Sequence, residues 1–115
     1  MKERDTLETT FSAVVVVVSG SDRLREAAAR AAQRVPTAQV KHCALENAAT
    51  TVATCWPFAI IVGEDVYAFD PQEFEALARD VAAVLIRVRE DGKPAGALAL
   101  NLQPQLLQAL RQRYR

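Results

Sequence analysis

The residues best suited to thiol or metal chemistry in this chain are two cysteines, Cys43 and Cys55, and the single histidine, His42. The cysteines are not spaced as a Cys-x-x-Cys pair, and one histidine beside one cysteine cannot complete a tetrahedral zinc site. A catalytic cysteine would also need a partner base and a lowered pKa. We therefore predict two reduced, partly buried thiols and expect neither a metal nor any other cofactor. A redox switch stays open as the alternative.

A second candidate is the polar turn Ser19-Gly20-Ser21-Asp22, which follows an apolar run and precedes a helical pattern. Backbone N–H groups at a helix N-terminus can cradle a phosphate, so this turn is a candidate anion-binding site. It matches neither the Gly-x-Gly-x-x-Gly fingerprint nor the phosphate-binding loop of nucleotide hydrolases, because the required glycine and lysine spacing is absent. Ser21 and Asp22 equally suit helix capping, which is the simpler interpretation.

Composition limits the classes of function that the chain can serve. Its 115 residues fit one domain, and 50% of them are hydrophobic, enough for a core that needs no metal or disulfide. Basic and acidic residues both number 14, so we expect neither nucleic acid nor an anionic membrane as a partner. The apolar run Ala13 to Val18 is too short to span a bilayer and lacks a basic lead and a cleavage motif. We therefore predict a cytoplasmic protein without a targeting segment.

The elements that must position these residues begin with two continuous apolar runs, Phe11 to Val18 and Phe58 to Val62. Both faces of such runs must be covered, so they predict central strands of a parallel sheet. Alternating residues predict a half-buried strand over Ala38 to Leu45, and Val81 to Val88 is the predicted fourth strand. A short fifth strand is expected at Ala97 to Leu100.

Apolar residues at helical spacing separate most of these strands. The predicted helices span Leu24 to Arg34, Glu46 to Cys55, Asp70 to about Asp80, and Gln105 to Arg113. Between strands four and five, about half a dozen residues around Asp91-Gly92 are too few for a crossover helix. Strand five is therefore either antiparallel or joined by a shrunken loop, and its direction stays open.

This alternation predicts a three-layer α/β sandwich with a central, mostly parallel five-stranded sheet. The fourth helix is expected to be shortened or missing. Residues 1–10 are polar and are expected to form a flexible N-terminal lead-in to a single domain over residues 11–115.

The order and spacing of these elements resemble a CheY-like receiver domain, which has a flavodoxin-like fold, over roughly residues 11–114. Three local stretches carry the resemblance. They are Ala95-Gly96-Ala97 with the apolar triplet after it and then Gln103-Pro104-Gln105-Leu106-Leu107, the strand Pro57-Phe58-Ala59-Ile60-Ile61-Val62, and the helix start Glu46-Asn47-Ala48-Ala49. The resemblance implies a bacterial signal-transduction domain related to response regulators.

The positions at which a receiver does its chemistry hold unsuitable residues in this chain. The resemblance places the phosphorylated aspartate at Gly63, the two magnesium-binding acids at Ser19 and Gly20, the hydroxyl residue at Arg87 or Val88, and the lysine at Asn101. Glu64 and Asp65 share the loop of Gly63, but without a metal site or the lysine they are poorly suited to accept phosphate. The resemblance therefore implies a protein without catalytic residues, neither phosphorylated nor an enzyme.

By the same resemblance, Leu98 to Tyr114 corresponds to the face through which receivers bind partners or dimerise. Loss of the fourth helix would leave this face more apolar, and a large exposed apolar patch signals an interface. Aromatic residues also gather after strand three, in Val66-Tyr67-Ala68-Phe69. The candidate interaction residues are Tyr67, Phe69, Leu100, Leu102, Gln105, Gln108 and Tyr114.

We therefore expect a pseudo-receiver, a protein–protein interaction module in bacterial signalling or cell organisation that binds a protein partner or forms a homodimer. The alternative is a small flavodoxin-like domain that binds a nucleotide or a phosphorylated metabolite at the carboxyl ends of its strands, where Ser19 to Asp22 would face Gly63 to Asp65. A constitutive subunit of a larger assembly is a third interpretation. Partner, pathway and oligomeric state stay open.

Overall fold

The computed structural model describes residues 13–113, so the predicted lead-in at residues 1–10 lies outside the described residues. The described chain forms four strands. They are β1 (Ala13–Val18), β2 (Ala38–Cys43), β3 (Ala59–Gly63) and β4 (Val84–Val88). These strands pair in the order β2-β1-β3-β4, and every pair is parallel. Within residues 13–113 the sheet therefore has four strands and not the five that we predicted.

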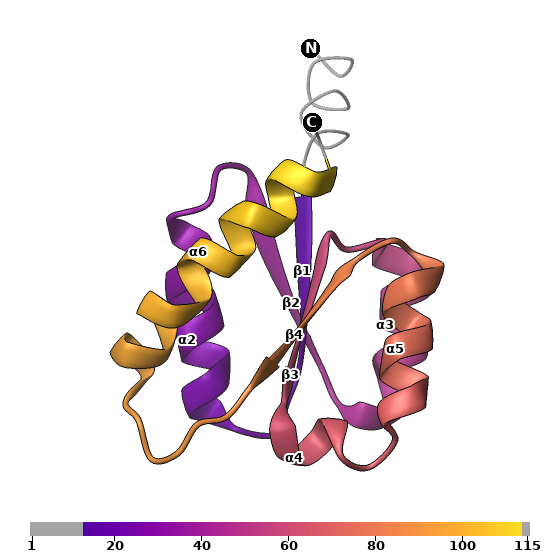
Figure 1. Cartoon of the computed structure of the whole chain (residues 1–115), viewed down its shortest axis with the longest axis horizontal. Coiled ribbons are helices and arrows are strands. Elements are labelled where there is room, and N and C mark those ends of the chain that lie inside the picture. Colours follow the sequence, from indigo (N-terminus) through magenta and orange to yellow (C-terminus); the bar gives the residue numbers. More distant parts are fainter. Residues whose placement is uncertain (1–12, 114–115) are drawn as a thin grey trace.

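Helices cover both faces of this sheet (Figure 1). One face carries α2 (Asp22–Gln33) and α6 (Ala95–Arg113), and the other carries α3 (Ala48–Cys55) and α5 (Pro71–Asp80). Two short helices, η1 (Leu45–Asn47) and α4 (Glu64–Tyr67), follow the carboxyl ends of β2 and β3. This three-layer α/β arrangement is the predicted class, and it is compatible with a flavodoxin-like fold.

The central strands divide the interior into two cores because successive residues of a strand point to opposite faces. Val15 and Val17 of β1 belong to the core beneath α2 and α6. Val16 and Val18 belong to the core beneath α3 and α5, which Phe74 of α5 fills from the other side. All five of these side chains are at most 1% exposed. Burial of each such side chain stabilises the fold by about 1.5–3 kcal/mol.

Side chains at the helix starts fix where α2 and α5 begin. The Ser21 hydroxyl accepts a hydrogen bond from the Leu24 N–H, and the Asp70 carboxylate accepts one from the Glu73 N–H, both at 3.2 Å. Pro71 occupies the first turn of α5, where its missing N–H costs nothing. Both helix starts were predicted from these residue types.

The fifth strand predicted at Ala97–Leu100 is wrong, because these residues lie in the first turns of α6. The N–H groups of Ala97 and Leu98 both donate to the Pro94 carbonyl at 3.1 Å. Buried residues of α6 recur at helical spacing and pack in the core shared with α2. They are Leu98, Ala99, Leu102, Leu106 and Ala109. Alanine and leucine favour helices, so a stretch that resembles a receiver strand continues as one 19-residue helix.

The chain passes from β4 through a turn directly into α6, so the question of the direction of a fifth strand no longer arises. Pro104 lies inside α6 without ending it. None of the helices within residues 13–113 is long and apolar enough to span a membrane.

Candidate functional site

The carboxyl ends of all four strands meet at one edge of the sheet, because the strands are parallel. The chain leaves β1 toward α2 on one face and leaves β3 toward α4 and α5 on the other (Figure 1). In doubly wound sheets, ligands bind in the crevice between two such strands. The turn after β1 and the loop after β3 therefore decide what this crevice can bind.

The turn after β1 already uses most of its polar groups within the chain. The hydroxyl of Ser19, a residue that is 5% exposed, accepts the Ser21 N–H at 2.9 Å. The Ser21 hydroxyl accepts the Leu24 N–H and donates to Oε1 of Glu90 at 2.9 Å. The Arg25 guanidinium donates to the Ser19 carbonyl at 3.1 and 3.2 Å. A carboxylate of the chain itself thus stands at the start of α2, where the helix dipole favours negative charge.

Gly20 and Asp22, the other two residues of the predicted anion site, are exposed. No heavy atom outside its immediate neighbours lies within 4 Å of the position where a Gly20 side chain would begin. Asp22 opens α2, and its Oδ1 lies 3.8 Å from Nη1 of Arg25. The turn therefore caps a helix, the simpler of the two interpretations drawn from the sequence.

Gly63, which the resemblance aligned with the phosphorylated aspartate, is closely packed. A Cβ atom built on it would lie 2.8 Å from Oδ1 of Asp65, 3.7 Å from Cδ2 of Leu24 and 4.0 Å from Oγ of Ser19. Even alanine would have to displace the Asp65 carboxylate, which accepts the Val66 N–H at 2.9 Å. Residues 13–113 contain no group of three or more His, Cys, Asp or Glu side chains that could hold a metal ion.

A network of side chains fills the carboxyl ends of β3 and β4. Oε1 of Glu64 on α4 accepts hydrogen bonds from Arg87 of β4, at 2.5 Å from Nη2 and 3.1 Å from Nε. The guanidinium carbon of Arg87 lies 4.1 Å from the centroid of the Tyr67 ring, a cation–π arrangement. The Tyr67 hydroxyl donates to Oε2 of Glu75 at 2.5 Å, and its ring stacks on Phe74. This network, which we call the Arg87 network, joins β4, α4 and α5.

These contacts keep both titratable donors of the Arg87 network in their protonated forms. The hydrogen bond to Glu64 raises the pKa of Arg87. The hydrogen bond to Glu75 raises the pKa of Tyr67, burial and nearby carboxylates add to this effect, and Arg87 opposes it. Neither group is suited to proton transfer near neutral pH, so the network joins elements and does not supply an acid or base.

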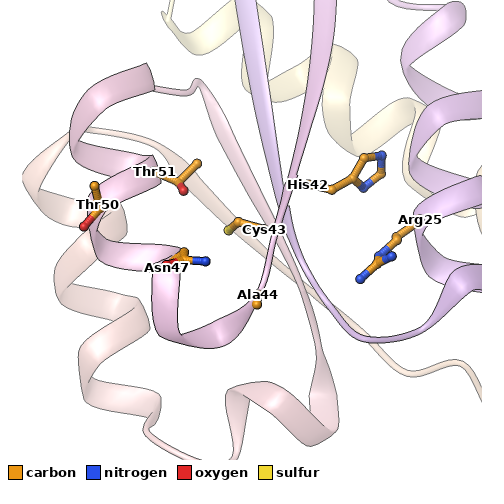
Figure 2. Close-up of a pocket in the computed structure, with 7 residues that line it drawn as sticks. All are labelled: Arg25, His42, Cys43, Ala44, Asn47, Thr50 and Thr51. Atoms are coloured by element: carbon orange, nitrogen blue, oxygen red, sulfur yellow. The ribbon is translucent and has the colours of Figure 1, made fainter.

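A cavity of about 560 Å³ lies at the carboxyl end of the edge strand β2 (Figure 2). It is lined by Arg25, His42, Cys43, Ala44, Asn47, Thr50 and Thr51. Figure 2 shows His42 and Arg25 on one side of β2 and Cys43 and Thr51 on the other. Burial raises the pKa of the Cys43 thiol, whereas burial and Arg25 lower the pKa of His42. His42 and Cys43 point to opposite sides of β2, so the imidazole does not face the thiol. Cys43 and Cys55 are free, partly buried thiols, as predicted.

On the face of the sheet that it shares with α2, helix α6 runs past β4 in the opposite direction. Near the carboxyl end of β4, Arg87 shares a cleft of about 290 Å³ with Asn101 and Gln105 of α6. Near the amino end of β4, Val84 shares a second cleft, of about 390 Å³, with Gln112 of α6. The two clefts follow each other along β4 and α6, because the helix runs antiparallel to the strand. The edge of β4 and this side of α6 therefore form one continuous surface.

Three of the predicted interaction residues are exposed on α6. Leu100 is 74% exposed and lies toward α2, whereas Gln105 and Gln108, further along the helix, are exposed on the side of β4. Leu102 is 1% exposed, so its prediction as a surface residue is wrong. Its position one turn from both Leu98 and Leu106 directs it into the core, which the strand interpretation of this stretch did not anticipate.

The remaining predicted interaction residues lie elsewhere. Tyr67 is 7% exposed and belongs to the Arg87 network, so its ring is unavailable as a docking residue. Phe69 is 79% exposed and lies between α4 and α5. Tyr114 lies outside the described residues.

Sequence reasoning found only part of an exposed row of amide side chains on α6, which we call the amide stripe. The row consists of Asn101, Gln105, Gln108 and Gln112, of which Gln105 and Gln108 were predicted interaction residues. Its spacing places all four on one side of a helix, and Asn101 joins the row only because the helix extends back to Ala95. The Arg87 network was missed, because its members come from three elements distant in sequence.

Comparisons with protein-family models, with curated proteins and with solved structures gave no match to this chain. Its function must therefore be argued from the residues and contacts described above.

Proposed function

We propose that this chain is a receiver-like protein–protein interaction module that does not accept phosphate, and that it binds its partner through the exposed side of α6. The observation that carries this proposal is Leu100, a large apolar side chain that is 74% exposed on a helix whose other leucines are buried or half-buried. Exposed apolar groups surrounded by polar ones are typical of interaction surfaces.

The exposed side of α6 has an apolar centre with a polar border. Leu100, exposed Pro104 and half-buried Leu107 recur at helical spacing along its middle. Gln105 and Gln108 border this row on the side of β4. A helix face of this kind, which is apolar in its middle and ends at the exposed Arg111, suits a partner with a complementary apolar groove or helix.

The chemistry of the carboxyl edge supports the absence of phosphotransfer. Gly63 has no carboxylate, and a side chain at this position would have to displace the Asp65 carboxylate. Glu64 is held by Arg87, and Asp65 accepts a hydrogen bond from the neighbouring backbone. Both carboxylates that could replace the missing aspartate are thus engaged within the chain.

One experiment tests the missing phosphate chemistry directly. Uniformly ¹⁵N-labelled full-length protein is titrated with magnesium and beryllofluoride, a phosphoryl analogue, while the amide signals of Gly63 to Asp65 are followed. We expect no change. A saturable shift that requires magnesium would show that Glu64 or Asp65 accepts the group, and this part of the proposal would have to be withdrawn.

A second experiment tests the interaction face. Full-length wild type and Leu100→Glu are used to capture binding proteins from cells of the source organism, with Leu45→Glu as the matched control. Leu45 is 41% exposed on η1, remote from α6 in the fold. We expect a partner that wild type and Leu45→Glu both retain and Leu100→Glu loses. A partner set that is identical for all three proteins would contradict the proposal.

The cleft beside β4 favours a second candidate function, binding of a phosphorylated metabolite or nucleotide. Arg89 and Lys93 line this cleft together with Asn101 and Gln105, and cations with amides suit a phosphate group, although the carboxylates of Glu64 and Asp91 line the same cleft. Thermal unfolding with a panel of nucleotides and sugar phosphates tests it, because a ligand that binds only the native state raises the melting temperature. An increase that Arg89→Ala abolishes would favour this function over the first.

A further inference from the structure

The outer edge of β4 exposes backbone groups that have no partner within residues 13–113. The Val84 N–H donates to the Phe58 carbonyl at 3.0 Å, so Val84 directs its backbone groups toward β3. Directions alternate along a strand, and Ile86 and Val88 therefore do the same. Leu85 and Arg87 point their N–H and C=O groups away from the sheet, where none of the described strands lies. Unpaired edges of this kind are templates for another strand.

We infer that a second copy of this chain pairs with this edge, β4 against β4 in antiparallel orientation, so that two four-stranded sheets join into one. The inference goes beyond the proposed function, because it uses the β4 edge and the neighbouring side of α6 and not the row of α6 residues that contains Leu100. It places the twofold axis at Ile86, where Leu85 of each copy pairs with Arg87 of the other. All four outward-pointing N–H groups of the two strands then find acceptors.

Neighbouring registers are less favourable for reasons visible in the chain. An axis at Arg87 would set two arginines directly opposite each other, and like charges in that position destabilise a strand pair. An axis at Leu85 would pair Arg87 with Ala83, whose N–H already donates to the Ala78 carbonyl at 2.8 Å. The axis at Ile86 avoids both problems.

This register also brings opposite charges together. Beyond the ends of β4, it brings the turn that contains Glu90 and Asp91 of one copy toward the segment of the other copy that contains Val81 and Ala82. Arg113 holds its guanidinium at those residues, with Nη2 2.8 Å from the Val81 carbonyl and 3.3 Å from the Ala82 carbonyl. Asp91 is exposed and makes no ion pair within the described residues, so it is available to this arginine. The pairing is formed twice, once on each side of the axis.

The amide stripe suits the same partner. It follows the β4 edge, since Asn101 and Gln105 line the cleft beside Arg87 and Gln112 lines the cleft beside Val84. Each amide carries both donors and an acceptor, so a row of amides is complementary to a second copy of itself running in the opposite direction. A twofold axis at Ile86 provides that orientation. With a formal net charge of zero, the two copies also lack overall repulsion.

Sedimentation velocity and amide hydrogen exchange on the full-length protein test the inference. We expect a monomer–dimer equilibrium, with the Leu85 and Arg87 amides becoming protected as protein concentration rises. A monomer at every concentration overturns the inference. A dimer whose Leu85 and Arg87 exchange does not change uses another surface and overturns it as well. Protection that is independent of concentration would mean that a segment of the same chain, residues 1–12 included, occupies the edge.

Two substitutions at one position separate edge pairing from loss of packing. Leu85→Pro removes the N–H that points outward but leaves every hydrogen bond between β4 and β3 in place. An edge strand tolerates such a change. Leu85→Ala removes the same side-chain contacts but keeps the N–H. We expect Leu85→Ala to dimerise and Leu85→Pro to remain monomeric, with circular dichroism showing that both are folded. Equal dimerisation of the two variants overturns the inference, and so does a failure of Leu85→Ala to dimerise.

A charge variant gives a readout that does not depend on Leu85. Asp91 has a left-handed backbone with φ of 48°, which asparagine also tolerates. Asp91→Asn should therefore keep the turn and weaken the dimer several-fold at low salt, with a smaller effect at high salt. An unchanged dimer would contradict this register. Leu100→Glu lies on the side of α6 away from β4 and should leave the dimer intact, so failure here and failure of the proposed function are distinguishable.

Discussion

The two edge strands of this sheet, β2 and β4, solve the same structural problem in opposite ways. β2 reads Ala-Gln-Val-Lys-His-Cys and has no fully buried residue, with Lys41 and His42 both exposed. β4 reads Val-Leu-Ile-Arg-Val, and its one charge, Arg87, is held by Glu64 over the Tyr67 ring. Charged residues on an edge discourage pairing with other chains. β2 is therefore a polar surface strand, whereas β4 is mostly apolar and has no described strand on its outer side.

The largest effect that distinguishes the two edges should appear in stability. Ile86 of β4 is 2% exposed, whereas Val40 of β2 is only partly buried. We expect Ile86→Ala to lower the free energy of unfolding by about 2–5 kcal/mol, because it leaves a cavity beneath α6. Val40→Ala should cost about 1 kcal/mol. Urea unfolding of both variants checks this, and equal losses would remove the distinction between the strands.

Charge removal should affect solubility in the same order. Arg87→Leu leaves β4 with no charge at all and releases Glu64, so we expect light scattering to rise at high protein concentration. Lys41→Leu removes one charge from β2 but leaves His42 and Gln39 beside it, and its effect should be smaller. If Lys41→Leu aggregated as readily as Arg87→Leu, the protection of β2 by its polar residues would have to be abandoned.

Alkaline pH should act on the side of β4. The hydrogen bond to Glu75 raises the pKa of Tyr67 above its unfolded value. The stability it contributes is complete below about pH 10 and is lost as pH rises through the folded pKa. Thermal unfolding as a function of pH should show this loss in wild type and a reduced loss in Tyr67→Phe. An identical alkaline slope in both proteins would argue against the hydrogen bond.

Acid should act, more weakly, on the side of β2. Burial and Arg25 lower the pKa of His42 below its unfolded value, so the folded state resists protonation of this ring. The resulting stability is present above about pH 6.5 and declines as pH falls through the folded pKa. We expect His42→Gln to flatten the stability profile in this range, and an NMR titration of the imidazole should give the pKa directly. A pKa at or above the ordinary value would refute the assignment.

The central strands and the capped helices could be predicted because their signals are local. Continuous valine in β1 and the Asp70-Pro71 pair before α5 each allow essentially one structure. The stretch from Ala95 to Leu102 is different, since its alanines and leucines suit a strand or a helix, and the choice depends on contact with α2. The small side chains of α2, such as Ala27 and Ala31, give α6 a smooth surface to pack on. The sequence of α6 itself contains no sign of this contact.

The candidate site was predictable in part for the same reason. Parallel strands place the residues after β1 and β3 at one edge, so the proximity of Ser19 and Gly63 follows from topology alone. The hydrogen bond from Ser21 to Glu90 joins residues 69 positions apart, so it could not be predicted from the spacing of residues in the sequence. Leu102 was misplaced because it was expected to follow a short strand, whereas it lies within α6, one turn from Leu98 and Leu106, and faces the core.

The placement of α6 has a consequence for how the protein is made. One whole face of the sheet is covered by α2 together with α6, and α6 contributes Leu98, Leu102, Leu106 and Ala109 to that core. Among the described elements, α6 is the last to be translated. Until it emerges from the ribosome, β3 and β4 present an uncovered apolar surface, and surfaces of this kind are prone to aggregation and are bound by chaperones. The native state of this domain is therefore reached only after the sheet has been synthesised, when its final helix closes over it.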